Sequence, residues 1–483
     1  MIRDDHLQAQ IKRFFNSSLT QQSYAFSIIA MVVFTCCLVG IFTRPLTFLA
    51  ILWPANPVLL GLFLRFPKLN NLGGWCGAIT AYILADLLTG NSPEITIYLT
   101  LSNLISVSVP LILLSLFKVN IRNYNHGFSF LYLFAMCALG GCLLSATFAV
   151  QTITQVPNSF MPPERFWTEF GMWWTGEIVN FITFLPLILT FPKKADRQQW
   201  LFELFTRPLK TNDVLPFIAI VISVAFTHIF FGPGALLYPL AALIWAALSY
   251  RLFSVALINS IVCLVTYHSL TYFYLSSSSD AYLATTISIR IGLCMLGIAP
   301  LILCVISQNR QKLFHQVLHY ANHDSLTNTL NRRYFLEQSQ LLIEQPEHRS
   351  VSILMIDLDH FKQMNDRHGH HVGDLVLQQF ARIVRCKIGP NDLFSRVGGE
   401  EFTVFSLNNS LTETIQLAER IHHAIETAVL NIEDHLKIQI TVSIGIAHQA
   451  LPLSATLQQL IVQADQALYS AKAQGRNQII IST

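Results

Sequence analysis

Charged side chains are scarce in this sequence of 483 residues. Asp, Glu, Lys and Arg make up 12% of the residues, against about 25% in an average soluble protein, whereas 52% are hydrophobic. This composition excludes a soluble globular enzyme over the whole length, and it also excludes a disordered chain. The net charge of +3 excludes nucleic-acid binding driven by bulk positive charge, so no nucleic-acid partner is expected.

The deficit of charge is confined to one part of the chain. The residues before Ser307 contain 16 Lys and Arg and 11 Asp and Glu, whereas the shorter remainder contains 15 and 17. We therefore expect a polytopic membrane domain over 1–306, a connecting segment over 307–322 and a soluble domain over 323–483. This last domain is large enough to bury a core of its own.

Cysteine is nearly absent from the soluble part. Of nine cysteines, only Cys386 lies there, which excludes a disulfide framework and indicates a reducing compartment. The other eight lie in apolar runs, where cysteine packs as a small hydrophobe. The pattern of a cleavable signal peptide is also missing, since the first apolar run, Tyr24–Phe42, is too long and is followed by many more.

Long apolar runs fill the first part of the chain. A membrane-crossing helix needs about 20 mostly apolar residues. We expect about ten spans, or as few as eight, since the longest run is divided only at Arg251. The ten segments are 24–43, 46–64, 73–90, 95–117, 128–150, 171–191, 214–231, 235–250, 252–274 and 284–306.

The basic residues between these segments predict the topology. With the N-terminus in the cytoplasm, 13 Lys and Arg fall in inside segments and only Arg44 and Arg165 in outside loops. Cytoplasmic loops are enriched in Lys and Arg, so this orientation is favoured. An even number of spans then places the C-terminus in the cytoplasm as well.

Three charged residues, Asp86, Glu177 and Arg290, fall within the expected spans. Such groups are costly in lipid and usually face the interior of the bundle. They form either a ligand or ion site, with Glu177 or Asp86 against Arg290, or an internal ion pair that stabilises packing. Other residues near Glu177 that favour a polar pocket with aromatic walls are Trp173, Trp174 and Asn180.

The connecting segment has apolar residues at helical spacing, at Leu313, Val317 and Tyr320. A helix continuing from the last span could transmit a rearrangement of the membrane domain, either as a short coiled-coil dimer or as a plain linker.

The soluble part alternates strands and helices, which predicts an α+β domain. The expected elements are a strand at 350–357, helices over 361–387, a hairpin at 393–407, a helix at 411–428, strands over 435–448, a helix at 454–473 and a strand at 477–482.

Two acidic clusters in this domain indicate a metal site. Ser350–Ile356 is apolar on both sides, so it is expected to be a buried central strand, and Asp357 and Asp359 follow it. Carboxylates at a strand end suit Mg²⁺, although an acidic strand end can also be a solvated turn. Lys362 and the backbone amides around Phe361 could bind phosphate.

The second cluster is the segment Arg396–Phe402, in which Gly398 and Gly399 precede Glu400 and Glu401. The glycine pair predicts a tight hairpin with positive φ angles and the acids at its tip. Together with Asp357, these acids predict a two-metal site that polarises a phosphoryl group. The sequence contains no Walker A motif, so P-loop chemistry is excluded.

These residues belong to a set of motifs by which the domain resembles the GGDEF diguanylate cyclases, with the variant signature Gly-Gly-Glu-Glu-Phe. The resemblance covers 321–483. Its motifs are Asp324–Thr327, Leu330–Arg333, Asp357–Lys362 with Asn365 and Asp366, Gly369–His370 with Gly373 and Asp374, Arg396–Phe402, Thr441–Gly445, and Ala464 to Asn477.

The resemblance implies a palm-like nucleotidyl-cyclase fold and condensation of two GTP into cyclic di-GMP, the signal of biofilm and motility regulation, with release of two diphosphates. It implies two Mg²⁺ per active site, with Mn²⁺ as an alternative. It also implies a homodimer, formed through this domain and the connecting helix, in which each 3′-hydroxyl attacks the partner's α-phosphate. The enzyme would be a multi-pass protein of the bacterial cytoplasmic membrane.

The resemblance also implies roles for single residues. Asp357, the carbonyl of Leu358, and Glu400 would hold the metals, and Glu400 would help to deprotonate the 3′-hydroxyl. Glu401 and Asp359 would support them. The substrate would be bound by Lys362, Lys472 and Arg476 at the triphosphate, by Asn365 and Asp374 at guanine, and by the segment of His360 and Phe361.

One position departs from the family pattern. Many members carry an Arg-x-x-Asp product-inhibition site just before the signature, and here Asp392 is present but Gly389 replaces the arginine. Arg385 and Lys387 are nearby but out of register. We expect feedback by cyclic di-GMP through this site to be weak or absent.

The membrane part resembles the first class of membrane-associated sensor domains of bacterial signalling enzymes. The resemblance is carried by Trp53-Pro54-x-Asn56-Pro57, by Trp174-x-x-Glu177 and by Phe184–Leu187. It implies a sensory role for a ligand that is not defined. Two alternatives remain open: a catalytically silent GTP or cyclic di-GMP receptor, and a transporter fused to a regulatory domain.

Overall fold

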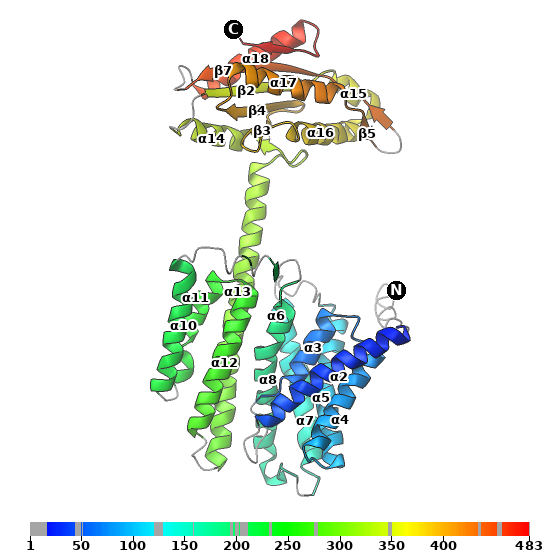
Figure 1. Cartoon of the computed structure of the whole chain (residues 1–483), viewed down its shortest axis with the longest axis vertical. Helices are drawn as coiled ribbons and strands as arrows, with labels where there is room; N and C mark the ends of the chain where they lie inside the picture. The colour runs from blue at the N-terminus through cyan, green and yellow to red at the C-terminus, as the bar shows by residue number, and fades with distance from the viewer. Residues whose placement is uncertain are drawn as a thin grey trace. The chain divides into compact units, whose positions relative to one another are not determined.

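The structure is a computed structural model that divides into two compact units, Met1–Gln311 and Lys312–Thr483 (Figure 1). Each unit is described by itself. The structure describes residues 17–43, 50, 52–119, 129–157, 159–193, 197–198, 202, 211–230, 234–274, 279–345, 350–432, 436–451 and 456–482, without the side chains of 212 and 271–282.

The N-terminal unit is helical. Its elements are α2 (Leu19–Phe42), α3 (Ala55–Arg65), α4 (Leu72–Leu88), α5 (Pro93–Leu116), α6 (Ser129–Ala135), the π-helix η2 (Met136–Cys142), α7 (Leu143–Ile153), η3 (Pro163–Arg165), α8 (Phe166–Thr190), α10 (Thr211–Ile229), η4 (Ala235–Leu237), α11 (Leu240–Ser249), α12 (Leu252–Tyr274) and α13 (Ser279–Asn322).

Each of the ten expected apolar segments contains a helix, but the helices differ in length. Within the described residues, six helical stretches are long and apolar enough to cross a membrane. The other four are shorter, at Ala55–Arg65, Leu72–Leu88, Asp213–Ile229 and Ala235–Ser249. In the segment expected at 46–64, the helix α3 begins only at Ala55, because Pro54 is its N-cap residue. Its helix is therefore shorter than the expected span. The number of spans therefore stays a prediction.

Glycine allows the closest helix packing in this unit. α2 packs against α4, and a Cβ added to Gly77 of α4 would lie 2.6 Å from the carbonyl oxygen of Phe26. At Gly73, one turn earlier, an added Cβ would lie even closer to the backbone of Gln22, against its carbonyl oxygen. Small residues four apart let two apolar helices approach backbone to backbone, which is a common way to pack helices in lipid.

The C-terminal unit is built on a six-stranded sheet of order β1-β3-β4-β2-β7-β8. Its strands are β1 (Leu330–Asn331), β2 (Ser350–Leu358), β3 (Leu393–Arg396), β4 (Glu401–Leu407), β7 (Val442–Ala450) and β8 (Ile479–Ile481), and β5 (Leu430–Ile432) pairs with β6 (Leu436–Ile438) separately. β2 is antiparallel to both β4 and β7 and is buried along almost its whole length, which confirms the expected central strand.

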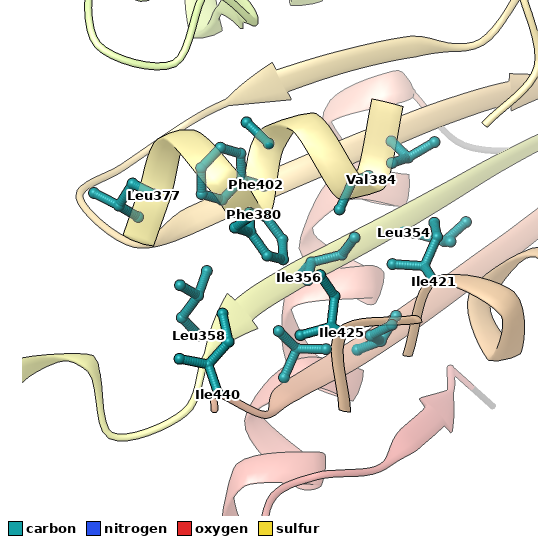
Figure 2. Close-up of a cluster of buried hydrophobic side chains, with 14 of the residues drawn as sticks. Leu354, Ile356, Leu358, Leu377, Phe380, Val384, Phe402, Ile421, Ile425 and Ile440 are labelled. Atoms are coloured by element: carbon teal, nitrogen blue, oxygen red, sulfur yellow. The ribbon is translucent and has the colours of Figure 1, made fainter. Parts of the chain in front are cut away.

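Helices cover both faces of this sheet. They are α14 (Arg332–Ile343), α15 (Phe361–His368), α16 (His370–Arg385), α17 (Leu411–Glu426) and α18 (Leu457–Ala473). Alternate residues of β2 point to opposite faces. Leu354 and Ile356 pack with Phe380 of α16 and Ile421 of α17 (Figure 2), whereas Ile353 packs on the other face with residues of α14 and α18.

The connecting segment is helical, as the apolar spacing predicts. α13 is a single helix of 44 residues that runs from the last apolar segment to Asn322. Leu313, Val317 and Tyr320 are exposed by 61%, 62% and 75% along its last turns.

Candidate active site

Asp357 lies near the end of the central strand, where three elements meet. Register pairs it with Glu401 of β4 on one side and with Ser443 of β7 on the other. Its Oδ2 lies 2.7 Å from Nζ of Lys472 in the last turn of α18. The structure therefore brings together an acid of the first cluster, the second acidic cluster and a predicted phosphate-binding lysine.

The electrostatics of this group favour a bound cation. Burial raises the pKa of the Asp357 carboxyl to about 6, and the charges of Glu400 and Glu401 act in the same direction. The ammonium group of Lys472 opposes this shift. Three carboxyls therefore repel one another around a single lysine, and additional positive charge would stabilise their ionised forms.

The acids of the signature lie on the hairpin between β3 and β4, but its turn differs from the one expected. Among the described glycines, only Gly90, Gly369 and Gly475 have positive φ, so the expectation for Gly398 and Gly399 is wrong. The four-residue loop closes through a hydrogen bond from the Val397 amide to the Glu401 carbonyl, 2.9 Å long, and a loop of this length needs no left-handed residue.

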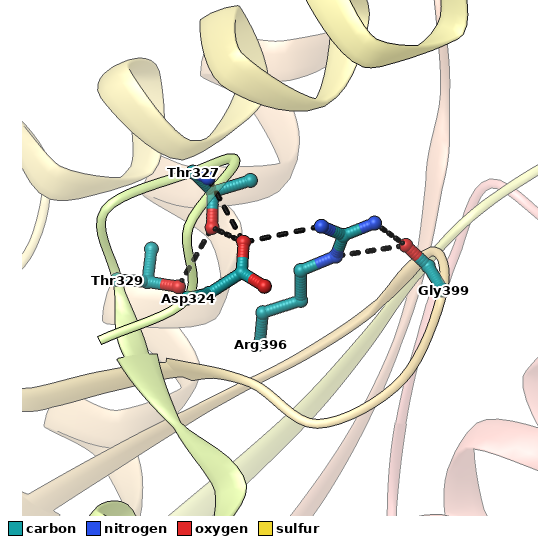
Figure 3. Close-up of polar contacts among 5 residues, drawn as sticks. All are labelled: Asp324, Thr327, Thr329, Arg396 and Gly399. Atoms are coloured by element: carbon teal, nitrogen blue, oxygen red, sulfur yellow. Dashed lines mark hydrogen bonds and ion pairs between the residues drawn. The ribbon is translucent and has the colours of Figure 1, made fainter. Parts of the chain in front are cut away.

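Arg396 holds the tip of this hairpin (Figure 3). Its Nε and Nη2 donate to the carbonyl oxygen of Gly399 at 2.9 and 2.6 Å, and its Nη1 lies 3.1 Å from Oδ1 of Asp324. Asp324 also accepts from the amide and hydroxyl of Thr327. The Asp324–Thr327 motif is thereby joined directly to the loop that carries Glu400.

The carboxylate of Asp359 is held by hydrogen bonds from neighbouring residues. Its two oxygens accept hydrogen bonds from the hydroxyls of Thr441 (2.8 Å) and Ser443 (2.7 Å) and from the amide of Asn477 (3.0 Å). Arg476 and Asn477 have φ of 65° and 45° in the turn after α18. The Asp359 carboxylate thus anchors the turn that carries Arg476.

The predicted guanine-binding residues Asn365 and Asp374 lie in the second turns of α15 and α16. His360, with φ of 58°, turns the chain from β2 into α15, and Phe361 is buried beneath the turn. A Cβ at position 373 would collide with Oδ1 of Asn365, so the glycine there makes room for this amide. That Oδ1 is buried and has no hydrogen-bond partner, as a ligand-binding atom would before its ligand arrives.

Comparisons with known proteins show the family of the chain. Residues 321–478 match the family described as diguanylate cyclase, GGDEF domain. The probable diguanylate cyclase DgcF of Escherichia coli K12 is 30% identical over 281 residues, which are 56% of this chain and 86% of that protein. The chain belongs to the GGDEF-domain diguanylate cyclases.

Similarity to these cyclases extends beyond the C-terminal unit. Probable diguanylate cyclase DgcF of Escherichia coli O157:H7 is 26% identical over 442 residues, which are 89% of this chain and 88% of that protein. Among solved structures, the coiled coil and GGDEF domain of DgcB from Caulobacter crescentus in complex with c-di-GMP is 26% identical, with a TM-score of 0.34, and the match covers 36% of this chain and 92% of that one.

At the expected product-inhibition site, Asp392 is bound within the domain and Gly389 replaces the arginine. The Asp392 carboxylate accepts from the Gly389 amide (2.7 Å) and from the Ser406 hydroxyl (2.6 Å), so both of its oxygens have internal partners. Arg385 and Asp392 line one surface pocket of about 610 Å³. Arg385, which is out of register in the sequence, therefore lines the same pocket as Gly389, the position at which many family members carry arginine.

The three charged residues within the expected spans, Asp86, Glu177 and Arg290, do not form the expected ion pair. Within the described residues, Arg290 donates to the Tyr267 hydroxyl (2.7 Å) and to the Met172 carbonyl, and no ion pair joins it to a carboxylate. Oδ1 of Asp86 accepts from Asn91 at 2.9 Å. The neighbours of Glu177 are described below.

Sequence reasoning missed four features of the cyclase domain: β1, α14, β5 and the anchoring role of Asp359. The capping pattern of Asn331, which accepts from the Tyr334 amide at 3.0 Å, was a usable signal for the start of α14. A two-residue strand such as β1 leaves no periodic signal.

Proposed function

We propose that this protein is a membrane-anchored diguanylate cyclase that condenses two GTP into cyclic di-GMP and releases two diphosphates. The observation that carries the proposal is the 2.7 Å contact between the buried Asp357 and the half-buried Lys472, beside Glu400 and Glu401. It combines carboxylates for a metal with a cation for phosphate, at the end of the central strand.

Asp357, the Leu358 carbonyl and Glu400 would hold Mg²⁺, two ions per active site, with Mn²⁺ as the alternative. Their oxygen atoms are the ligands that Mg²⁺ prefers, and the mutual repulsion of the carboxyls fits a divalent cation. Such an ion polarises the phosphoryl group and lowers the pKa of the attacking hydroxyl. Glu401 would support the hairpin loop rather than bind the metal.

Each GTP would be bound at both ends. Lys362, Lys472 and Arg476 neutralise the triphosphate, and Lys472 would exchange its contact with Asp357 for a phosphate oxygen. Asn365 and Asp374 accept the N1–H and N2–H groups of guanine, which adenine lacks at these positions. A site that pairs such donors rejects analogues without them. Glu400 would accept the proton of the 3′-hydroxyl.

A single active site holds one GTP, so the reaction requires two facing subunits. The exposed apolar residues of α13, Leu313, Val317 and Tyr320, would pair with those of a second copy. The membrane domain, which resembles the first class of membrane-associated sensor domains, would bind an unidentified ligand and set the geometry of this dimer.

The six long apolar helices support a multi-pass location in the bacterial cytoplasmic membrane with both termini in the cytoplasm. Of the basic residues behind this topology, Arg65, Lys68, Lys118, Lys193, Arg197 and Arg251 inside and Arg165 outside lie in the described part. The remainder, Arg3, Lys12, Arg13, Arg44, Arg122, Lys194, Arg207 and Lys210, lie outside it.

The test is incubation of the purified full-length protein with GTP and Mg²⁺, with chromatographic analysis of the product. We expect cyclic di-GMP and two equivalents of diphosphate. Glu400→Gln should lower the rate at least about 100-fold, in line with the loss of a general base. The matched control Glu419→Gln changes an exposed acid of α17 and should retain full activity. GTP binding without product in the wild type would instead favour the silent receptor.

A further inference from the structure

Two motifs of the membrane domain that the cyclase reaction does not use meet in the structure. Nδ2 of Asn56 in α3 donates to Oε1 of Glu177 in α8 at 2.9 Å. Three residues along each segment, the amide of Trp53, just before α3, donates to Oδ1 of Asn180 in α8, also at 2.9 Å. Residues more than 120 positions apart in the chain therefore form one polar contact between two buried helices.

The contact extends into a network on the neighbouring helices. Oδ1 of Asn103 in α5 accepts from Asn56 at 2.9 Å and from the Trp53 indole at 3.1 Å. The Tyr82 hydroxyl of α4 donates to Asn56 at 2.7 Å. This satisfies the amide of Asn56 completely and fixes its NH₂ group toward the carboxylate.

On the other side, α7 and α8 contribute to the same network. The Ser145 hydroxyl lies 3.5 Å from Oε1 of Glu177 and accepts from the Trp173 indole at 3.1 Å. Oε1 is thus well supplied with donors. Oε2 of the same carboxylate is buried and accepts no hydrogen bond, and the Ser106 hydroxyl and the Cys142 thiol are its other polar neighbours.

No described cation compensates this carboxylate. Arg290 lies against the backbone of α8, where a Cβ at position 176 would be 2.8 Å from its Nη1, but it is bound to Met172 and Tyr267. The titratable groups beside Glu177 are Tyr82, Cys137 and Cys142, which carry no positive charge. A buried carboxylate with a free oxygen and no counter-ion is costly, which makes it a site for a cation.

The donor set indicates the class of cation. Around Glu177 lie amide and hydroxyl groups and the thiols of Cys137 and Cys142, and among these described residues there is no group of three His, Cys, Asp or Glu that could hold a metal ion. A divalent cation would need more carboxylate ligands than this site offers. We propose that the membrane domain binds a small monovalent cation, a proton or an alkali metal ion, at the free oxygen of Glu177.

The helix that carries Glu177, α8, is in contact with α13. α8 packs against α13 at Gly176 with Arg290 and at Gly297 with Ile182. α13 is the helix that continues to the cyclase domain. A regulatory effect of the cation rests on the proposed function, but binding itself does not, so the experiment is carried out without GTP.

The test uses the tryptophan fluorescence of the full-length protein in lipid nanodiscs, because Trp53 and Trp173 belong to the network. The emission is titrated with pH in choline chloride, and then with NaCl and KCl at fixed pH and constant ionic strength. A proton site should give a pH midpoint that salt does not move. An alkali-ion site should give a saturable response to Na⁺ or K⁺ that shifts the midpoint to lower pH.

Glu177→Gln, which keeps the shape of the protonated group, should abolish the titration. Glu169→Gln, a change to another buried acid of α8, should preserve it. A flat response of the wild type to both pH and salt, or an unchanged titration in Glu177→Gln, overturns the proposal.

A second measurement needs no variant. Dicyclohexylcarbodiimide modifies protonated carboxyls in apolar surroundings, and mass spectrometry locates the adduct. Glu177 should be labelled at low pH and protected either at high pH or by the bound alkali ion. Labelling of Glu177 that is independent of both conditions, or absent in all of them, contradicts the proposal.

Discussion

At the scale of the residue, Asp357 and Asp359 show how two acids of one motif acquire different environments. They lie two positions apart near the end of β2. The oxygens of Asp359 are engaged by Thr441, Ser443 and Asn477, whereas Asp357 faces Lys472 and the acids of the signature. Of these two acids, Asp357 is therefore the one we propose as a metal ligand.

Asp359→Asn should impair substrate binding more than chemistry. The new NH₂ group would meet a hydroxyl or the Asn477 amide, so the turn that carries Arg476 loses an anchor. A hydrogen bond to a charged group contributes about 1.5–3 kcal/mol, and we expect a loss of stability of this order. The KM for GTP should rise about tenfold with a smaller change in kcat, as measured by steady-state kinetics.

The matched control is Asp465→Asn, which removes an exposed acid of α18. It should change neither KM nor thermal stability. An Asp359→Asn enzyme with wild-type KM would contradict the positioning role.

At the scale of the element, the Asp324–Arg396 pair joins the start of the cyclase domain to the hairpin between β3 and β4. Burial alone would raise the pKa of Asp324, but hydrogen bonds from Thr327 and Arg396 lower it below the usual value. The folded state therefore favours the ionised carboxyl. The contribution to stability is present above the ordinary Asp pKa of about 4 and is lost as the pH falls through the lower folded value.

Asp324→Asn should consequently lower the melting temperature of the cyclase domain at neutral pH, but the difference from wild type should shrink as the pH falls below the ordinary Asp pKa of about 4. Scanning calorimetry of the purified full-length protein between pH 3 and pH 7 measures this difference. A difference that persists unchanged at pH 3 would mean that the carboxylate charge is not what stabilises the contact.

The elements whose apolar residues recur at regular spacing were predictable from the sequence. The strand β2, the hairpin of β3 and β4, and the helices α17 and α18 lie close to their expected positions. The expected left-handed turn at Gly398 and Gly399 was wrong, because Arg396 and the Val397 amide close the loop by contacts that no local pattern encodes.

At the scale of the whole molecule, the altered inhibition site predicts a cyclase with little product feedback. Gly389 supplies no guanidinium group, and both oxygens of Asp392 are engaged. Initial rates with increasing cyclic di-GMP should stay constant. Gly389→Arg should introduce inhibition, since position 389 lies beside Asp392 and does not require a left-handed backbone.

One result would revise this prediction. Strong inhibition of the wild type would show that Arg385, which lines the same pocket, replaces the missing arginine. In that case Arg385→Ala should relieve the inhibition.

The sequence by itself determined the division of the chain into an apolar and a charged part, the positions of the apolar helices and the order of the cyclase motifs. These properties depend on composition and local period. Only the tertiary structure decided that Asn56 meets Glu177, that Arg290 pairs with neither acid and that Asp359 anchors the turn of Arg476. Such contacts join residues far apart in the chain, and they form only where packed helices and strands bring the side chains within hydrogen-bonding distance.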